Sequence, residues 1–297
     1  MTPAPSALTG LVLAVVATAC FATLDASTKV AGASVPLAMA LWFRYAFQAW
    51  STTAAIIPSR GFRALRTEHP RFQCLRGLLL MMTSMFSFFS LQHMPVGEFT
   101  AIVMVTPLAI TVLAATVLRQ QVSGMRWALV AGGFAGTLVV LRPGGDAFGW
   151  AMLLPLGLVV CNAWFQVLTS RLAQTEDPMV MQFYSGWVGT LVMSAILPFV
   201  WVTPTSGSVW LALGLMGLMG TVGHFLLTLA YARAPAATLM PCLYAQIGFA
   251  VLAGWLLFDH VPDRTSVAGI LLIAACGAMG AWLTVRESRI VVQPAEG

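Results

Sequence analysis

The chain has 297 residues, of which 59% are hydrophobic and only 8% are charged. Soluble domains carry about 25% charged residues, so this composition cannot form a water-facing surface and indicates an integral membrane protein. The formal net charge is +5, but the basic residues form no cluster with interleaved aromatic residues, which argues against a nucleic-acid partner. The five cysteines lie far apart without a CxxC or Cys/His pattern, so we expect no metal site and no cofactor.

Ten apolar segments follow one another along the chain. A helix needs about 20 mainly apolar residues to cross a bilayer, and each segment approaches or exceeds this length. The predicted spans cover residues 8–30, 35–57, 72–92, 96–118, 124–141, 149–171, 178–201, 208–231, 236–258 and 265–285. No positively charged segment precedes the first span, so we expect it to remain in the protein as a helix.

The second half of the chain repeats the first. A seven-residue step from a basic residue to a proline occurs in both halves, and so does an 18-residue step from a glycine to a proline. The matched residues are Lys29 and Arg171, Pro36 and Pro178, Gly77 and Gly217, and Pro95 and Pro235. This duplication predicts two repeats of five spans each, residues 1–145 and 146–297.

The basic residues predict the orientation, because they favour the cytoplasmic side of a membrane. With the N-terminus inside, eleven basic residues fall at inner loops and ends and three at outer ones. Both termini are therefore expected in the cytoplasm, for a multi-pass protein of the bacterial inner membrane. Five spans are an odd number, so the second repeat must cross in the opposite sense. We expect an all-α integral membrane fold of ten transmembrane helices, in two inverted five-helix repeats around a central cavity.

Three local patterns resemble those of a known family. The first half has Lys29 at the end of span 1, then Pro36, and then the pair Arg44-Tyr45 in span 2. The first repeat closes with TPLAITVLAATVLRQQVSGMRWALVAGGFAGTLVVLRPG, and the second contains GHFLLTLAYARAPAATLMPCLYAQIGFAVLAGWLLFDHVPDRTSVAGILLIAACG. From about residue 8 to 286, the chain resembles the EamA type of the drug/metabolite transporter superfamily.

The resemblance implies that spans 1, 3, 4, 6, 8 and 9 surround the cavity and that spans 5 and 10 lie behind them. It leaves the substrate open, since the family moves amino acids, nucleotide-like cofactors, vitamins and drugs. The family often has Glu after spans 4 and 9, where this chain has Gln120-Gln121 and Asp259. These positions are at span ends, so we expect a changed helix-end contact and an intact transport site.

Two ionisable residues lie inside the first two spans, where a charge is costly and usually functional. Arg44 suits a substrate carboxylate or phosphate, because its fork accepts two oxygens; a structural tie to Asp25 or to backbone carbonyls is the alternative. Gln48 follows Arg44 by one turn on the same face. Asp25 is a candidate for a substrate amine or a proton, or for an ion pair with Arg44 or Lys29.

Span 8 carries a polar stripe on an otherwise apolar helix. Thr221, His224, Thr228 and Tyr231 recur at helical spacing, and Ser84 of span 3 is the repeat mate of His224. A stripe facing lipid is penalised, so it must face a cavity or a neighbouring helix. His224 and Thr228 are therefore candidates for substrate binding, with interhelical hydrogen bonding as the alternative.

Further candidates lie in spans 3, 6 and 9, where amides, a phenol and aromatic rings suit a polar or planar solute and equally suit helix packing. They are Phe86, Asn162, Trp164, Gln166, Tyr244 and Gln246. Pro107 and Pro241 interrupt the repeat mates, spans 4 and 9, and are predicted hinges. Gly132–Gly136 and Gly277–Gly280 predict close helix packing or a dimer seam.

The chain has no GxxxxGK[ST] motif, which argues against ATP-driven pumping, and its four scattered histidines argue against an enzyme. We expect a secondary transporter of small polar metabolites, with amino-acid-like compounds and export favoured. Uptake of a vitamin or cofactor such as riboflavin or S-adenosylmethionine is the alternative, and a channel is the alternative from another class. The expected partners are a small-molecule substrate and the lipid bilayer, with proton coupling and a monomer or homodimer left open.

Overall fold

The computed structural model describes residues 7–116, 123–141, 150–173, 175–233, 239 and 242–291, and every regular element in these ranges is helical. The first half contains α1 (Ala7–Gly32), α2 (Leu37–Arg60), the 3-10 helix η1 (Phe62–Leu65), α3 (Pro70–His93), α4 (Val96–Val103), α5 (Thr106–Thr116) and α6 (Gly124–Leu141). The second half contains the 3-10 helix η2 (Trp150–Leu153), α7 (Leu154–Leu172), α8 (Pro178–Val200), α9 (Gly207–Arg233), α11 (Ala245–Phe258) and α12 (Arg264–Val291). The all-α fold is confirmed.

Four of the described helices are long and apolar enough to cross a bilayer, five further segments are shorter apolar helices, and the 24-residue α2 falls in neither group. The four are Thr9–Gly32, Pro70–His93, Pro178–Val200 and Gly207–Arg233. Predicted span 4 is divided between α4 and α5, and predicted span 9 contains α11. Within the described residues, the other helices follow the predicted spans.

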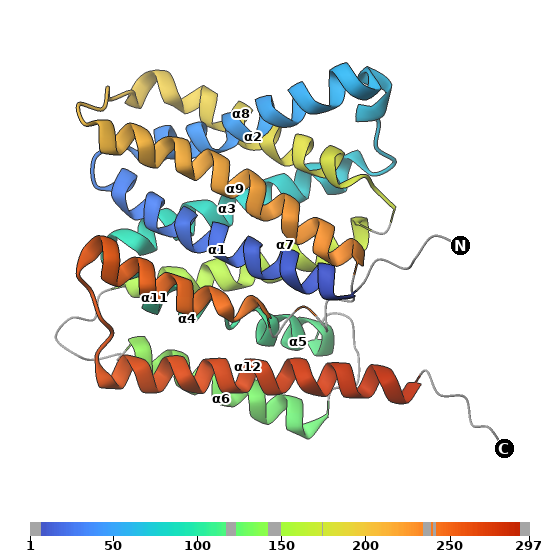
Figure 1. Cartoon of the computed structure of the whole chain (residues 1–297), viewed down its shortest axis with the longest axis vertical. Helices are drawn as coiled ribbons and strands as arrows, with labels where there is room; N and C mark the ends of the chain where they lie inside the picture. Colours follow the sequence, from blue (N-terminus) through green and yellow to red (C-terminus); the bar gives the residue numbers. More distant parts are fainter. Residues whose placement is uncertain are drawn as a thin grey trace.

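The two halves pack with the symmetry of an inverted duplication. Helix α1 packs against α9, and their repeat mates α7 and α3 pack against each other. In the two other large helix–helix contacts, a helix packs against its own repeat mate: α2 against α8, and α6 against α12. Figure 1 shows the resulting stack, with α2 and α8 at one edge, α6 and α12 at the opposite edge, and α1, α3, α7 and α9 between them.

The break in span 4 follows from its proline. Pro107 has no backbone N–H, so the carbonyl of Val103 loses its helical donor. The Thr106 hydroxyl donates to that carbonyl instead, at 2.6 Å. Helix α4 therefore ends at Val103 and α5 begins at Thr106. Pro241, Gln120 and Gln121 lie outside the described residues, so the second hinge and the first changed helix end stay predictions.

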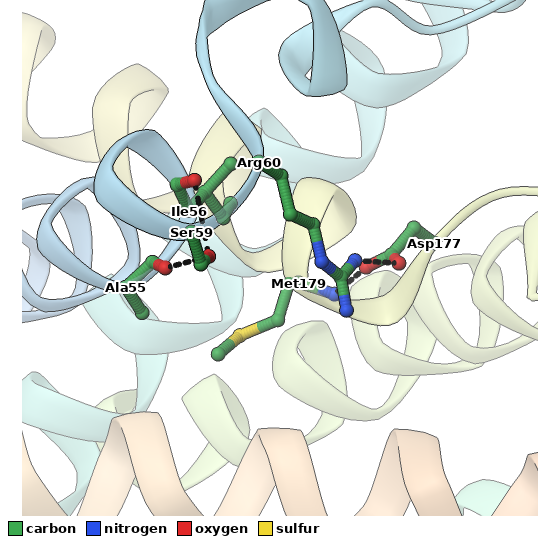
Figure 2. A network of polar contacts seen from close by, with 6 residues as sticks. All are labelled: Ala55, Ile56, Ser59, Arg60, Asp177 and Met179. Carbon is green, nitrogen blue, oxygen red and sulfur yellow. Dashed lines mark hydrogen bonds and ion pairs between the residues drawn. The ribbon is translucent and has the colours of Figure 1, made fainter.

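A polar network joins the end of α2 to the start of α8 (Figure 2). Arg60 Nη1 and Asp177 Oδ2 form an ion pair at 2.6 Å. The other carboxylate oxygen of Asp177 accepts the Met179 backbone N–H at 2.7 Å and caps α8. Close by, the buried Glu176 accepts the Thr67 hydroxyl at 2.6 Å. The loop after α2 is therefore held to the loop before α8, which ties the two halves together at this end.

The small-residue faces lie inside the protein, where α6 meets α12. A Cβ at Gly136 would lie 2.8 Å from Cγ1 of Ile273, and one at Gly269 would lie 2.7 Å from Cγ2 of Val140. Only a hydrogen at these positions allows the two backbones to approach so closely. A side chain at Gly277 would overlap the Tyr244 ring. These glycines therefore have a packing role within one chain.

Candidate functional site

A cavity of about 120 Å³ lies between the two halves, enclosed by α1, α2, α3, α4, α7, α9 and α11. Its polar lining consists of Asp25, Arg44, Thr83, Ser84, Ser87, Asn162, Gln166, His224 and Gln246. Its apolar lining consists of Phe21, Leu24, Leu80, Phe99, Val103, Leu158, Phe165, Leu227 and Leu243. Seven of the twelve predicted binding residues line this cavity.

Arg44 is held at the cavity wall by one residue from each repeat. Its side chain is buried, with 6% of its surface exposed. Nη1 donates to the Ser84 hydroxyl at 2.6 Å, and Nη2 lies 3.3 Å from Nε2 of His224. Tyr45 also contacts the Ser84 hydroxyl, at 2.6 Å. The Arg44 Nε is buried without a hydrogen-bond partner, so the guanidinium keeps donor capacity for a ligand.

His224 accepts from Arg44, because a guanidinium only donates. Its Nε2 is therefore unprotonated, and the ring is neutral with its proton on Nδ1. The ring packs against Phe21 at a centroid distance of 4.9 Å and stands edge-on to Phe165 at 5.8 Å. Both phenylalanines line the cavity, so His224 is one member of an aromatic wall.

Asp25 is the one carboxylate in the described lining, and its partner is neutral. Gln246 donates to Oδ2 of Asp25 at 3.3 Å. Asp25 forms no ion pair with Arg44 within the described part of the chain. Lys29 is engaged elsewhere, since its Nζ donates to the carbonyls of Leu91 at 2.6 Å and Met94 at 2.8 Å. The predicted alternative of an ion pair at Asp25 is therefore not realised in this structure.

Helix α7 contributes two amides that bridge to neighbouring helices. Asn162 donates to the Thr106 hydroxyl at the break in span 4, at 3.4 Å. The Gln166 carbonyl oxygen accepts the Tyr231 hydroxyl at 3.2 Å. Thr228, also from the α9 stripe, donates to the His224 carbonyl of its own helix. Of the four stripe residues, only His224 lines the cavity. Tyr231 does not line it but donates to Gln166, which does.

The other five predicted binding residues lie outside the cavity lining. Gln48 donates to the side-chain and backbone oxygens of Gln182 on α8. Phe86 packs on Gly157, and Trp164 is 40% exposed on the outside of the bundle. Thr228 is satisfied within α9, and Tyr244 packs against α12 with its hydroxyl buried and unpartnered.

Two ionisable residues near the ends of predicted spans are buried. Arg76 is only 1% exposed; it donates to the Thr169 hydroxyl, the Met181 carbonyl and the Ser185 hydroxyl. The position of Glu98 at the outer end of predicted span 4 predicts exposure to water, but its side chain is only 7% exposed and faces His260 at 3.1 Å. The expected exposure of Glu98 was wrong, because helix packing covers its side chain. Arg76 was detectable, since it stands two turns before Ser84 on the same helical face.

The family model for the EamA-like transporter family matches the chain twice, over residues 8–142 and 149–282. The chain belongs to the EamA-like transporter family. It is therefore a multi-pass membrane protein with the two-repeat architecture of a drug/metabolite transporter, and its class is that of a transporter of small metabolites.

This EamA-like transporter is similar to curated proteins with different substrates. It is 30% identical over 256 residues to a riboflavin transporter of Rhizobium johnstonii, covering 86% of this chain and 82% of the relative. It is 26% identical to an S-adenosylmethionine uptake transporter of Rickettsia prowazekii, over 84% of each chain. It is 25% identical to a pseudopaline exporter of Pseudomonas aeruginosa, over 91% of this chain and 95% of the relative.

A solved crystal structure shares the fold with a TM-score of 0.66. It covers 97% of this chain and 100% of its own, at 18% identity. At this identity the likeness supports the fold alone. The substrate must therefore be argued from the cavity.

Proposed function

We propose that this EamA-like protein is a secondary transporter that binds its substrate in the central cavity and works by alternating access. The observation that carries the proposal is a pair of opposite charges in one cavity, Arg44 and Asp25, each held by neutral partners. Unpaired charges in a membrane interior are costly, and a substrate with complementary groups would satisfy both. Ligand sites usually occupy about 300–1,000 Å³, so loading requires the 120 Å³ cavity to widen.

The favoured substrate is an amino-acid-like zwitterion. Its carboxylate would accept from the free donors of Arg44, which suits the guanidinium fork. Its ammonium group would donate to Asp25, beside the amide of Gln246. The hydroxyls of Thr83 and Ser87 line the same cavity and offer further hydrogen bonds for orientation.

A vitamin or cofactor is the second candidate, supported by the aromatic lining. Phe21, Phe99 and Phe165 all face the cavity and suit a planar heterocycle. Relatives named for riboflavin and for S-adenosylmethionine uptake lend support. S-adenosylmethionine carries both an α-amino acid group and an adenine ring, so it would satisfy the charged pair and the aromatic wall together.

The remaining expectations are proposals about topology and transport. We infer two repeats, at residues 1–145 and 146–297. We also infer that both termini lie in the cytoplasm, which is supported by the start of α1 and the end of α12 lying at the same end of the bundle in Figure 1. Export stays our prediction from the family resemblance, although relatives are named for uptake and for export. The hinges at Pro107 and Pro241, proton coupling and the oligomeric state are likewise predictions.

Counterflow in proteoliposomes tests the transport mechanism. Vesicles are loaded with unlabelled amino acids, riboflavin or S-adenosylmethionine, and entry of the labelled compound is followed. Saturable uptake that unlabelled substrate accelerates from the opposite side supports a transporter. Flux that never saturates and shows no counter-exchange would support the channel alternative and overturn the proposal. Reporter fusions at each terminus test the topology, and reporters on opposite sides would contradict it.

A further inference from the structure

A second buried cation stands behind the cavity wall. Arg76 is on α3, two helical turns from Ser84, and is one of the largest fully buried side chains in the described structure. Its donors meet a hydroxyl at 2.9 Å, a carbonyl at 2.7 Å and another hydroxyl at 2.6 Å, none of which is charged. Among the described residues, no carboxylate forms an ion pair with Arg76 or with Arg44.

The ring of Phe165 contacts Arg76 on one side and lines the cavity. The Arg76 guanidinium carbon stands over the Phe165 ring, 5.1 Å from its centroid. Phe165 lines the cavity, and its ring meets His224 edge-on. A phenyl ring has no dipole that can reorient as water does, so its effective dielectric constant is low and it screens a charge poorly. The positive field of Arg76 therefore reaches the cavity that Arg44 lines.

The charges around the described cavity do not balance. One guanidinium group lines the cavity and a second lies behind its wall, whereas the lining contains one carboxylate, that of Asp25. His224 is neutral because it accepts from Arg44. The net charge is +1 when Asp25 is ionised and +2 when it is protonated. An anion brought into a membrane interior loses its hydration, and fixed positive charges offset that loss. The cavity is thus built for a solute that brings negative charge.

We propose that the central cavity selects metabolites with a net negative charge and that Arg76 is a positioning residue for this selection, acting through the field across Phe165. This inference rests on the proposed function. Within its amino-acid-like substrates, it favours those with an additional acidic group over neutral zwitterions. Arg44 would contact the anionic group, and Arg76 would set the charge preference without touching the solute. One unit charge about 10 Å from another changes a binding constant by on the order of tenfold at the effective dielectric of protein sites.

Matched pairs of compounds test the charge preference. The purified full-length protein is titrated with glutamate against glutamine and with riboflavin 5′-phosphate against riboflavin, and the dissociation constant of each is measured by thermal shift. We expect the anionic member of at least one pair to bind about tenfold or more tightly than its neutral partner. Equal or tighter binding of the neutral members, or no binding by either anion, would overturn the inference.

Three variants assign the preference to Arg76. Arg76→Gln is expected to reduce the ratio of anion to neutral affinity by on the order of tenfold, whereas Arg76→Lys keeps the charge and the ratio. Arg60→Gln is the matched control, because it removes a cation whose side chain is 58% exposed, at the end of α2. An unchanged ratio in Arg76→Gln refutes the role of Arg76. If Arg76→Gln does not fold, Arg76→Lys is the test. Loss of the preference for anions in Arg76→Lys refutes the role of Arg76, and a retained preference supports that role.

Counterflow separates this inference from the proposed function. If a neutral or zwitterionic solute exchanges saturably and anions do not, the transport proposal holds and the charge preference is wrong. If anions bind with the expected ratio but nothing exchanges across the bilayer, the charge preference holds and the transport proposal fails.

Discussion

Ser84 and His224 occupy matched positions in the two repeats, and both contact the guanidinium of Arg44. Ser84 accepts from Nη1 at 2.6 Å, and His224 Nε2 lies 3.3 Å from Nη2. Each residue stands seven positions after the matched glycines Gly77 and Gly217. The duplication therefore places two mates on opposite sides of one cation. In the proposed alternating-access mechanism, the two halves would move relative to each other around this group.

Arg44→Ala is expected to lower transport affinity by about 100-fold. Removing one partner of a buried, hydrogen-bonded charge typically costs about 2–5 kcal/mol. His224→Ala removes a neutral acceptor, and the net worth of one such hydrogen bond is about 1 kcal/mol, so we expect a loss of about fivefold. Apparent affinities from counterflow give both values.

Trp164→Phe serves as the control for these two variants, because its side chain lies outside the cavity and is 40% exposed. It should transport like the unmodified protein. If Arg44→Ala and His224→Ala both retained wild-type affinity and full transport, the cavity would not be the substrate site.

Asp25→Asn distinguishes an amine ligand from a structural carboxylate. The substitution keeps the shape and removes the charge that would accept a substrate ammonium group. We expect at least about tenfold weaker binding of amine-bearing solutes, since hydrogen bonds to a charged group are worth about 1.5–3 kcal/mol. Solutes without an amine should bind as before. Equal weakening of both kinds in the same thermal-shift titration would show that Asp25 only supports the fold.

The network in Figure 2 predicts unequal effects for the two partners of one ion pair. The Arg60 and Asp177 side chains are 58% and 38% exposed, and an exposed pair contributes about 0–1 kcal/mol. Arg60→Ala should therefore lower the free energy of unfolding by less than about 0.5 kcal/mol. Asp177→Ala also loses the cap on the Met179 N–H, which costs about 1 kcal/mol more. Unfolding in detergent measures both, and equal losses would argue against the cap.

Gly136→Ala should destabilise the contact of α6 with α12. The added methyl would lie 2.8 Å from Ile273 Cγ1 and 3.0 Å from the Gly269 carbonyl oxygen, and overpacking of this kind costs about 1–3 kcal/mol. Gly248→Ala on α11 is the matched control, because nothing lies within 4 Å of its added methyl. The control should be neutral or stabilising, since alanine favours helix. A stable Gly136→Ala protein would mean that the two helices can separate without cost.

The spans and the fold class were predictable because hydrophobicity and repeat spacing are properties of the chain read in order. A segment of about 20 apolar residues must cross the bilayer as a helix, since its backbone has no other hydrogen-bond partners there. Two copies with an odd number of spans must run in opposite senses. Pro107 likewise marks the break between α4 and α5, because a missing N–H acts locally.

The composition of the cavity was only partly predictable, because the rotation of each helix is decided by its neighbours. Asn162 and Trp164 are two residues apart on α7, yet Asn162 lines the cavity and Trp164 is exposed on the outside. Gln48 shares a helical face with Arg44, but its amide is taken by Gln182 of α8.

Hydropathy places Arg76 near the start of a span, and the packing of α3 against α7 and α8 buries it. The sequence by itself determined that polar side chains lie inside a duplicated bundle, since buried polar groups in a membrane require partners. Only the tertiary structure decided which side chains partner one another and which are left for a ligand, because that choice depends on contacts between helices far apart in the chain.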